Sequence, residues 1–90
     1  MHFEWDPRKA ALNMRKHGVT FAEAATVFGD ILARVVADPD HSRTEDRFLI
    51  IGMSTRRRLL FVAFADRGQA VRLISARELT NKERDAYETE

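Results

Sequence analysis

Residues 47–77 run RFLIIGMSTRRRLLFVAFADRGQAVRLISAR and carry the clearest structural signal in the chain. Two runs within it, Phe48–Ile51 and Leu59–Phe64, are apolar at every position, which is typical of strands buried on both faces. A third run, Ala70–Arg77, alternates in polarity, as a strand with one exposed face does. Short turn segments separate the three runs, so the stretch predicts an antiparallel meander.

Helices are predicted at both ends of the chain. Asp6 caps a helix over Pro7–His17, because aspartate accepts from the free first-turn amides and proline fits the first helical position. Near the other end, Thr80 and Glu83 have the spacing of a capping box and start a helix that runs to about Thr89.

Between the first helix and the meander, the sequence predicts another helix and another strand. Thr20 and Glu23 match a second capping box, in which each side chain accepts from the other residue's amide. This box starts a helix over Phe21–Phe28, and the β-branched run Ile31–Ala37 predicts the first strand of the sheet.

This order of elements indicates an α+β fold in a single domain over residues 1–90. We expect two N-terminal helices, a four-stranded antiparallel sheet and a C-terminal helix, with helices covering one face of the sheet. The second face is then partly open, and its strands and hairpins carry arginines. Such a face suits a phosphate backbone.

Composition excludes several classes of protein. The chain has no cysteine, which removes disulfides, thiolate zinc sites and cysteine nucleophiles and is compatible with the cytoplasm. No apolar run approaches the about 20 residues that span a bilayer. The motifs for nucleotide binding, hydride transfer, metalloproteolysis and serine esterases are absent, and the three histidines lack metal-ligand spacing. We therefore expect a cytoplasmic protein that uses neither metal nor cofactor.

Positive charge is concentrated in the meander. Residues 47–77 contain seven arginines and one acid, a net charge of +6, whereas residues 78–90 carry −3 and the whole chain +1. The guanidinium fork of arginine binds phosphate or carboxylate through two parallel hydrogen bonds. We therefore predict one electropositive surface on the sheet that binds an anionic partner. The alternative is a set of solvated arginines without a ligand.

Metal-free RNA cleavage needs a group that takes the 2′-hydroxyl proton, cations that stabilise the charge developing on the phosphate, and a group that assists the leaving 5′-oxygen. Arg58 begins the third predicted strand, Arg72 and Arg77 lie in the fourth, and Tyr87 lies on the last helix. Together they supply the cations and one proton donor. The structural alternatives are an ion pair between Arg77 and a following glutamate, and a packed Tyr87 whose hydroxyl lies in water.

Short motifs follow one another along nearly the whole chain. They are Phe3-Glu4-Trp5-Asp6, Lys16-His17-Gly18-Val19, Phe21-x-Glu23-Ala24, Val27-Phe28, His41-x-x-x-Glu45-x-Arg47, Ile51-Gly52, Arg58-Leu59-Leu60, Arg72-x-Ile74-Ser75-Ala76-Arg77 and Glu83-Arg84-x-x-Tyr87-Glu88. In this order and spacing they resemble the BrnT toxins. Two positions depart from that family: Thr55-Arg56-Arg57 stands where a glycine-containing turn is common, and Ala65 stands where threonine is common.

The resemblance implies a RelE-like fold and a metal-independent ribonuclease that blocks translation, the toxin of a bacterial type II toxin–antitoxin pair. It also implies a ribbon-helix-helix, BrnA-like antitoxin, through which alone the complex contacts operator DNA. Taken with the chemistry above, the catalytic candidates are Arg77, Arg72, Arg58, Tyr87, His41 and Glu45. The RNA-binding candidates, from the resemblance and the charge pattern, are Lys16, His17, Arg47, Arg56, Arg57 and Arg67.

Two other interpretations stay open. A non-catalytic binding module would use the same basic sheet to dock a protein or a nucleic acid, and an inactive toxin would keep only its antitoxin interface. Cleavage of RNA in EDTA that Arg77→Ala abolishes would favour the ribonuclease. Arg34 lies outside the basic stretch with no predicted neighbour, so we expect Arg34→Ala to leave cleavage nearly unchanged.

Overall fold

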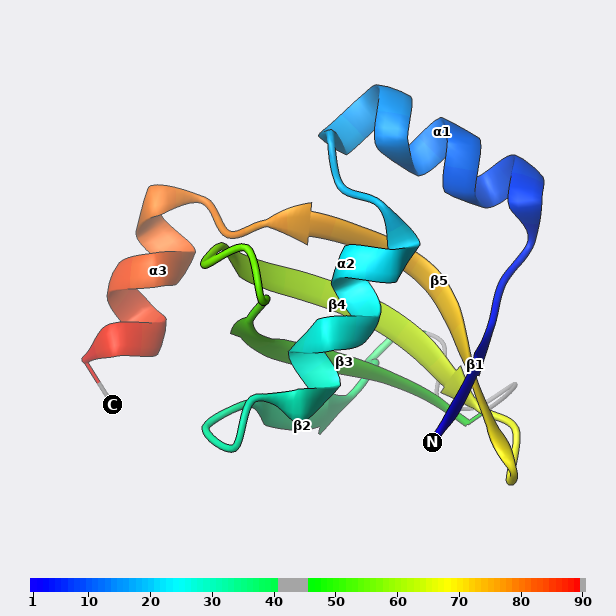
Figure 1. Cartoon of the computed structure of the whole chain (residues 1–90). Coiled ribbons are helices and arrows are strands. Elements are labelled where there is room, and N and C mark those ends of the chain that lie inside the picture. The colour runs from blue at the N-terminus through cyan, green and yellow to red at the C-terminus, as the bar shows by residue number, and fades with distance from the viewer. Residues whose placement is uncertain (41–45, 90) are drawn as a thin grey trace.

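The computed structural model describes residues 1–40 and 46–89, which form a five-stranded sheet, three α-helices and a short 3-10 helix (Figure 1). In chain order the elements are β1 His2–Glu4, α1 Pro7–His17, α2 Phe21–Thr26, the 3-10 helix η1 Val27–Gly29, β2 Arg34–Ala37, β3 Arg47–Met53, β4 Leu59–Asp66, β5 Ala70–Glu78 and α3 Asn81–Glu88. The predicted α+β class is confirmed. None of these helices is long and apolar enough to cross a membrane.

The sheet contains one strand more than predicted. Its order is β1-β5-β4-β3-β2, with antiparallel neighbours except for β1, which runs parallel to β5 and places Phe3 opposite Val71. The prediction of four antiparallel strands was therefore wrong for the N-terminal segment. Three residues are too few to show a polarity pattern, and their partner strand lies far along the chain, so no local signal marks this pairing.

The predicted first and last helices are confirmed with their caps. Asp6 accepts from the Arg8 amide at 2.8 Å, and Gly18 ends α1 with a left-handed φ of 69°. At α3, Thr80 and Glu83 satisfy each other's amides at 2.9 and 3.1 Å, which is the complete capping box.

The second helix and the first predicted strand are both shorter than predicted. The α-helix ends at Thr26 and tightens into η1, and the strand begins at Arg34 rather than at Ile31. The Asp30 carboxylate is the physical reason: one oxygen accepts from the Leu32 amide at 2.9 Å and holds a turn, and the other accepts from the Met53 amide at 2.7 Å. The turn is therefore tied to β3 and cannot extend as a strand.

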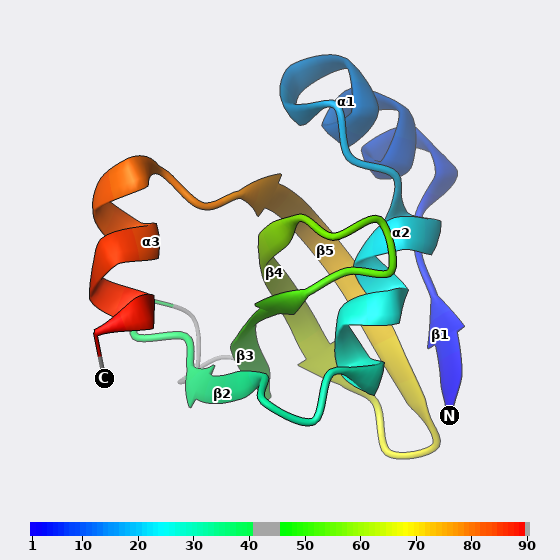
Figure 2. The same cartoon turned by 60° about the vertical axis from the view of Figure 1, so that its left-hand side comes forward.

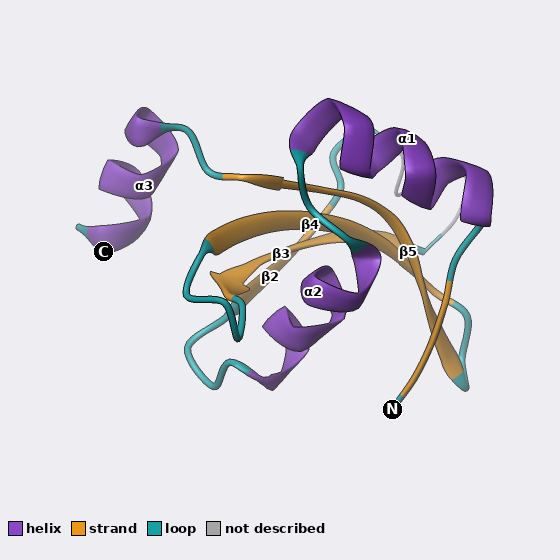
Figure 3. Cartoon of the chain, turned by 45° about the horizontal axis from the view of Figure 1, so that its top comes forward, coloured by secondary structure: helices purple, strands orange, loops and turns teal. Residues whose placement is uncertain are grey.

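The hydrophobic core lies between the sheet and α2 with η1, which cover one face of the sheet (Figure 3). Its buried side chains are Val19, Phe21, Ala24, Val27, Ile50, Leu60, Val62, Phe64, Leu73 and Ala76. β3 approaches η1 so closely that a Cβ atom at Gly52 would lie 2.9 Å from Ala33 and 3.0 Å from Val27. Glycine at this position therefore permits the close packing.

Helix α1 lies along the edge of β5 rather than over the face of the sheet (Figures 1 and 3). Asn13, which is buried, accepts from the Ala76 amide at 3.0 Å and donates to the Ala76 carbonyl at 2.8 Å. A third hydrogen bond joins it to the Val19 carbonyl at 3.0 Å. One side-chain amide thus supplies the two hydrogen bonds that a neighbouring strand would have supplied to β5.

Helix α3 lies beyond the end of β5, on the opposite side of the molecule from α1 (Figures 1 and 2). The Tyr87 hydroxyl donates to the Leu32 carbonyl at 3.2 Å, so the helix reaches back to the segment before β2. The expectation that all helices share one face is therefore wrong. Among the described residues, α2 and η1 cover the core face. The sheet face opposite them, called here the open face, meets α3 at one end and the C-terminal end of α1 beside β5.

Candidate nucleic-acid interface

Strand register places four arginines on the open face. Residues paired across neighbouring antiparallel strands point to the same side of a sheet. One row across the open face consists of Arg34, Ile51, Phe61 and Arg77, and a second row consists of Arg47, Ala65, Arg72 and Glu4. The rows lie four residues of β4 apart, or about 13 Å.

A pocket opens on this face beside Arg77 and is called here the Arg77 pocket. Its volume is ≈ 370 Å³, within the range of about 300–1,000 Å³ that is typical of small-ligand sites. It is lined by His17, Asp38, Pro39, Asp40, Leu49, Phe61, Ala63, Ser75, Ala76 and Arg77. The end of α1, the segment after β2 and the three long strands thus meet at one hollow.

The guanidinium of Arg77 is held from two sides. It lies over the Phe61 ring, 4.7 Å from the centroid, and donates to both Glu83 carboxylate oxygens at 2.7 and 2.9 Å. A further bond at 3.2 Å goes to the Glu78 carbonyl. The pairing with a following glutamate, considered above as the structural alternative, is therefore present.

This pairing sets the charge states. The Arg77 fork and the Thr80 amide lower the pKa of Glu83 to about 2, and Glu83 raises the pKa of Arg77. Both side chains are 35% exposed, so the pair remains open to water. The Arg77 fork therefore keeps its charge in a fixed orientation, with both terminal nitrogens bonded to Glu83, and Asp38 and Asp40 line the same pocket.

Tyr87 packs against the open face and contacts Arg34 rather than Arg77. The Arg34 guanidinium lies 5.0 Å from the centroid of the Tyr87 ring. Our expectation that Arg34 is isolated was therefore wrong, because strand register and α3 supply neighbours that the linear sequence does not reveal. A strict two-residue alternation along β2, aligned with β3, is the signal that could have placed Arg34 with Arg77.

Arg72 and Arg47 occupy the second row. Arg72 forms an ion pair with Glu4 of β1 at 3.0 Å, and both side chains are more than one-third exposed. To bind a single phosphate together, as predicted, Arg72 and Arg77 have to bridge the distance of about 13 Å between the two rows.

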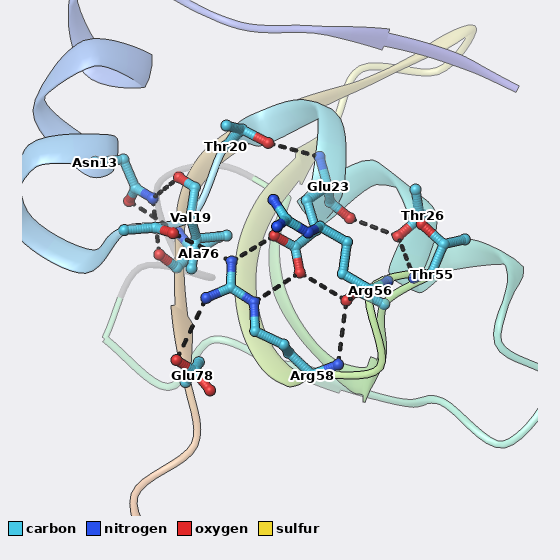
Figure 4. A network of polar contacts seen from close by, with 12 residues as sticks. Asn13, Val19, Thr20, Glu23, Thr26, Thr55, Arg56, Arg58, Ala76 and Glu78 are labelled. Atoms are coloured by element: carbon cyan, nitrogen blue, oxygen red, sulfur yellow. Dashed lines mark hydrogen bonds and ion pairs between the residues drawn. The ribbon is translucent and has the colours of Figure 1, made fainter.

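Arg58 lies on the other side of the sheet, with α2 (Figure 4). Two of its nitrogens bind the two carboxylate oxygens of Glu23, one at 2.9 Å, and it also donates to the Gly18 carbonyl at 3.1 Å. Ser54 donates to Glu23 at 2.7 Å, and Arg58 reaches Glu78 at 3.4 Å. Arg58 therefore joins the β3–β4 turn to α2 and to the end of α1.

Glu23 explains why one capping box is incomplete. Thr20 accepts from the Glu23 amide at 3.0 Å, as predicted, but the carboxylate turns to Arg58 and Ser54 instead of to the cap. The hydrogen bonds from Arg58, against the opposing effect of burial, lower the pKa of Glu23. Charge-assisted bonds to a guanidinium outweigh a bond to a neutral amide, so the reciprocal half of the box was wrongly predicted.

Of the remaining candidates, His17 lines the Arg77 pocket, whereas the arginines of the two β-turns lie away from Arg77. Arg56 and Arg57 are exposed in the turn before β4, with Arg57 at a left-handed φ of 65°, and Arg67 is exposed in the turn after it, one strand length away. The predicted single electropositive surface is therefore divided among three regions. Lys16 and His17 lie at the end of α1. His41 and Glu45 lie outside the described residues.

Sequence reasoning missed three residues of the Arg77 pocket. Phe61 lies beneath Arg77, and Asp38, which is buried, lines the pocket with Ser75. An apolar strand position was the only visible signal for Phe61. Glu83, which orients Arg77 from α3, was considered as its partner in the sequence. Within residues 1–40 and 46–89, no group of three or more potential ligands is arranged to hold a metal ion.

Comparison with known proteins identifies related chains. The family model described as the ribonuclease toxin BrnT of type II toxin–antitoxin systems matches residues 5–83. The chain is also similar to the 1.1 Å crystal structure of the Brucella abortus ribonuclease toxin BrnT, with 27% sequence identity and a TM-score of 0.72. The match covers 90% of this chain and 99% of the Brucella chain. No curated protein sequence matches significantly.

Proposed function

Because this chain belongs to the BrnT family of ribonuclease toxins of type II toxin–antitoxin systems, we propose that it is a metal-independent endoribonuclease that cuts RNA in the cytoplasm and thereby inhibits translation. The observation that carries the proposal is the Arg77 pocket. It combines a fixed, charged guanidinium with an imidazole, His17, on its wall. A fixed cation and an imidazole beside one hollow supply two of the three functions that metal-free RNA cleavage requires.

In this proposal Arg77 binds the scissile phosphate and stabilises the charge that develops on it. Phe61 and Glu83 hold the fork, so little reorganisation is needed when the charge forms. The arginines supply the positive charge that a metal ion brings in other nucleases. Arg72 and Arg47, in the second row about 13 Å away, are proposed to bind phosphates further along the backbone.

Proton transfer is assigned by residue type. An imidazole nitrogen can accept or donate a proton, so a histidine can take the 2′-hydroxyl proton or assist the leaving oxygen. His17 is proposed for one of these roles because it lines the Arg77 pocket. His41, Glu45 and Tyr87 remain proposed partners. Arg58 is proposed to act on RNA only through the fold, since it is bonded to the buried Glu23, 3% exposed, on the face of the sheet opposite the Arg77 pocket.

The proposed partner is a ribbon-helix-helix, BrnA-like antitoxin that carries the operator-binding surface. An acidic segment of the antitoxin would enter the Arg77 pocket, attracted by the arginines, and exclude RNA from it. Saturating antitoxin is then expected to abolish cleavage. Undiminished cleavage in the complex would contradict this part of the proposal.

The test is cleavage of RNA in EDTA by the wild type, by Arg77→Ala and by Arg8→Ala. Arg8 is an exposed arginine of α1 that does not line the Arg77 pocket, which makes it a matched control. We expect the wild type and Arg8→Ala to cut equally well and Arg77→Ala to cut very slowly while still binding RNA. Equal cleavage by all three proteins would remove Arg77 from the site.

The second candidate function is a non-catalytic binding module, and the Arg77–Glu83 pair favours it, since a fork already filled by a carboxylate is partly neutralised. RNA that is bound by the wild type but left intact, in a preparation that is fully folded, would support this alternative. Growth after induction gives the matching measurement in cells, because a binding module need not arrest it.

A further inference from the structure

A second pocket adjoins the Arg77 pocket on the side of α1 and is called here the α1 groove. Its volume is ≈ 540 Å³. It is lined by Lys9, Leu12, Asn13, Arg15, Lys16, His17, Ile74 and Ser75. The two hollows share a wall, because His17 and Ser75 line both. A chain that leaves the Arg77 pocket past His17 therefore enters the α1 groove.

The α1 groove is cationic at its rim and apolar along its floor. Lys9, Arg15 and Lys16 contribute positive charges, the residues of 1–40 and 46–89 that line the groove include no acid, and α1 itself contains none. Leu12 is 59% exposed, although it lies between Lys9 and Lys16 on the side of the helix that faces the groove. An exposed leucine flanked by cations suits a ligand with a flat apolar surface and negative charges.

The opposite wall of the groove is formed by an irregularity in β5. The register with β4 shifts between Ala63, opposite Ser75, and Phe64, opposite Leu73, so Ile74 is left without a partner. Such a β-bulge redirects the side chain of the extra residue. Ile74 lines the α1 groove and not the Arg77 pocket. Together with Leu12 it forms the apolar part of the lining of the groove.

We propose that the α1 groove is a nucleotide subsite that holds the RNA strand next to the cleaved position. A base packs on Leu12 and Ile74, and Lys9 and Lys16 contact flanking phosphates. The inference rests on the proposed function, because RNA is favoured by continuity with the Arg77 pocket. The competing occupant of a cationic groove is an acidic segment of a protein such as the antitoxin.

The test uses 2′-O-methyl oligoribonucleotides, which lack the attacking 2′-hydroxyl, in lengths from a dinucleotide to about an octanucleotide. The variant is Lys9→Ala with Leu12→Ala. Its matched control is Arg8→Ala with Met14→Ala, which removes the same charge and an exposed apolar side chain from α1 outside the groove, Met14 being 50% exposed against 59% for Leu12. Melting temperatures confirm that both proteins fold.

We expect the Lys9/Leu12 variant to bind the longest RNA about 5-fold to 10-fold more weakly than the control does, with a loss that grows with RNA length. Its plot of log affinity against log salt should flatten by about 0.7, the value for one lost phosphate contact on a single strand. Equal affinity and slope in the two variants would overturn the subsite proposal while leaving cleavage by the wild type intact. A wild type that neither binds nor cuts RNA would overturn the proposed function as well.

A measurement of antitoxin binding distinguishes RNA from an antitoxin segment as the occupant of the α1 groove. The subsite proposal predicts that the Lys9/Leu12 variant and the control bind antitoxin alike. If the Lys9/Leu12 variant loses antitoxin affinity and retains RNA affinity, the groove belongs to the protein partner and the proposal is wrong.

Discussion

Two arginine–glutamate pairs of the same chemistry occupy opposite faces of the sheet. In each, two guanidinium nitrogens bind two carboxylate oxygens. The Glu23 side chain is 3% exposed and that of Arg58 27%, whereas Arg77 and Glu83 are both 35% exposed. Burial therefore separates a pair that holds the fold from a pair whose fork a ligand can reach.

The largest effect is expected from Arg58→Ala. It leaves the buried Glu23 carboxylate without its cation and should lower the free energy of unfolding by about 3 kcal/mol or more. Urea denaturation measures this. Arg56→Ala, in the same turn but exposed, should stay within about 0.5 kcal/mol of the wild type. An Arg58→Ala protein that has normal stability and fails to cut RNA would show that Arg58 acts in catalysis. The contrast between the two pairs would then be wrong.

Arg77→Ala is expected to show the opposite profile. Loss of the fork should slow single-turnover cleavage about 100-fold or more, as removal of an electrostatic stabiliser does. Because the pair is partly exposed, the free energy of unfolding should change by no more than about 1 kcal/mol. A large loss of stability would instead show that the Arg77–Glu83 pair holds the fold as the Arg58–Glu23 pair does.

Glu83→Gln tests the exposed Arg77–Glu83 pair through the pH dependence of the free energy of unfolding. The pKa of Glu83 is lowered from 4.5 in the unfolded chain to about 2, so the stability it contributes is present above pH 4.5 and is lost as the pH falls toward 2. We expect wild type and variant to differ by about 1 kcal/mol near neutral pH, after screening by water, and to converge in acid. If the difference in the free energy of unfolding did not change with pH, the effect of Glu83→Gln would come from packing and not from the charge.

Arg34→Ala should give the smallest change. Its guanidinium contacts the Tyr87 ring, a contact worth about 0.5–1 kcal/mol at exposed sites, so α3 should be held less firmly. Hydrogen exchange of the α3 amides measures this, with Arg8→Ala as the control. Unchanged exchange would show that Tyr87 is held by Leu32 alone.

Local signals predicted most of the elements correctly. The caps at Asp6 and Thr80 act over a few residues, and the structure confirms them. The strict alternation expected in residues 70–77 was wrong, because the register shift at Ile74 leaves Leu73 and Ala76 on the core face and Ser75 and Arg77 on the opposite face. The missing strand β1 and the Asn13 bonds to Ala76 join distant segments, so no local pattern contains them.

The candidate site was predicted as a set of residue types and not as an arrangement. Composition and resemblance singled out Arg58 and Arg77 together, yet the structure places them on opposite faces. Only the positions of Glu23 and Glu83 distinguish the two arginines. The sequence presents both glutamates alike, as the third residue of a capping box.

The long-range bonds of β5 also dictate the order in which the molecule can fold. β1 and α1 leave the ribosome first, but their hydrogen-bond partners, Arg72 and Ala76 among them, come near the end of the sheet. Contacts of such high sequence separation form slowly, since a long loop must close before they stabilise anything. A nascent chain therefore cannot assemble the Arg77 pocket until synthesis has passed residue 77, and the N-terminal helix has no strand edge to cover before Ala76 is made.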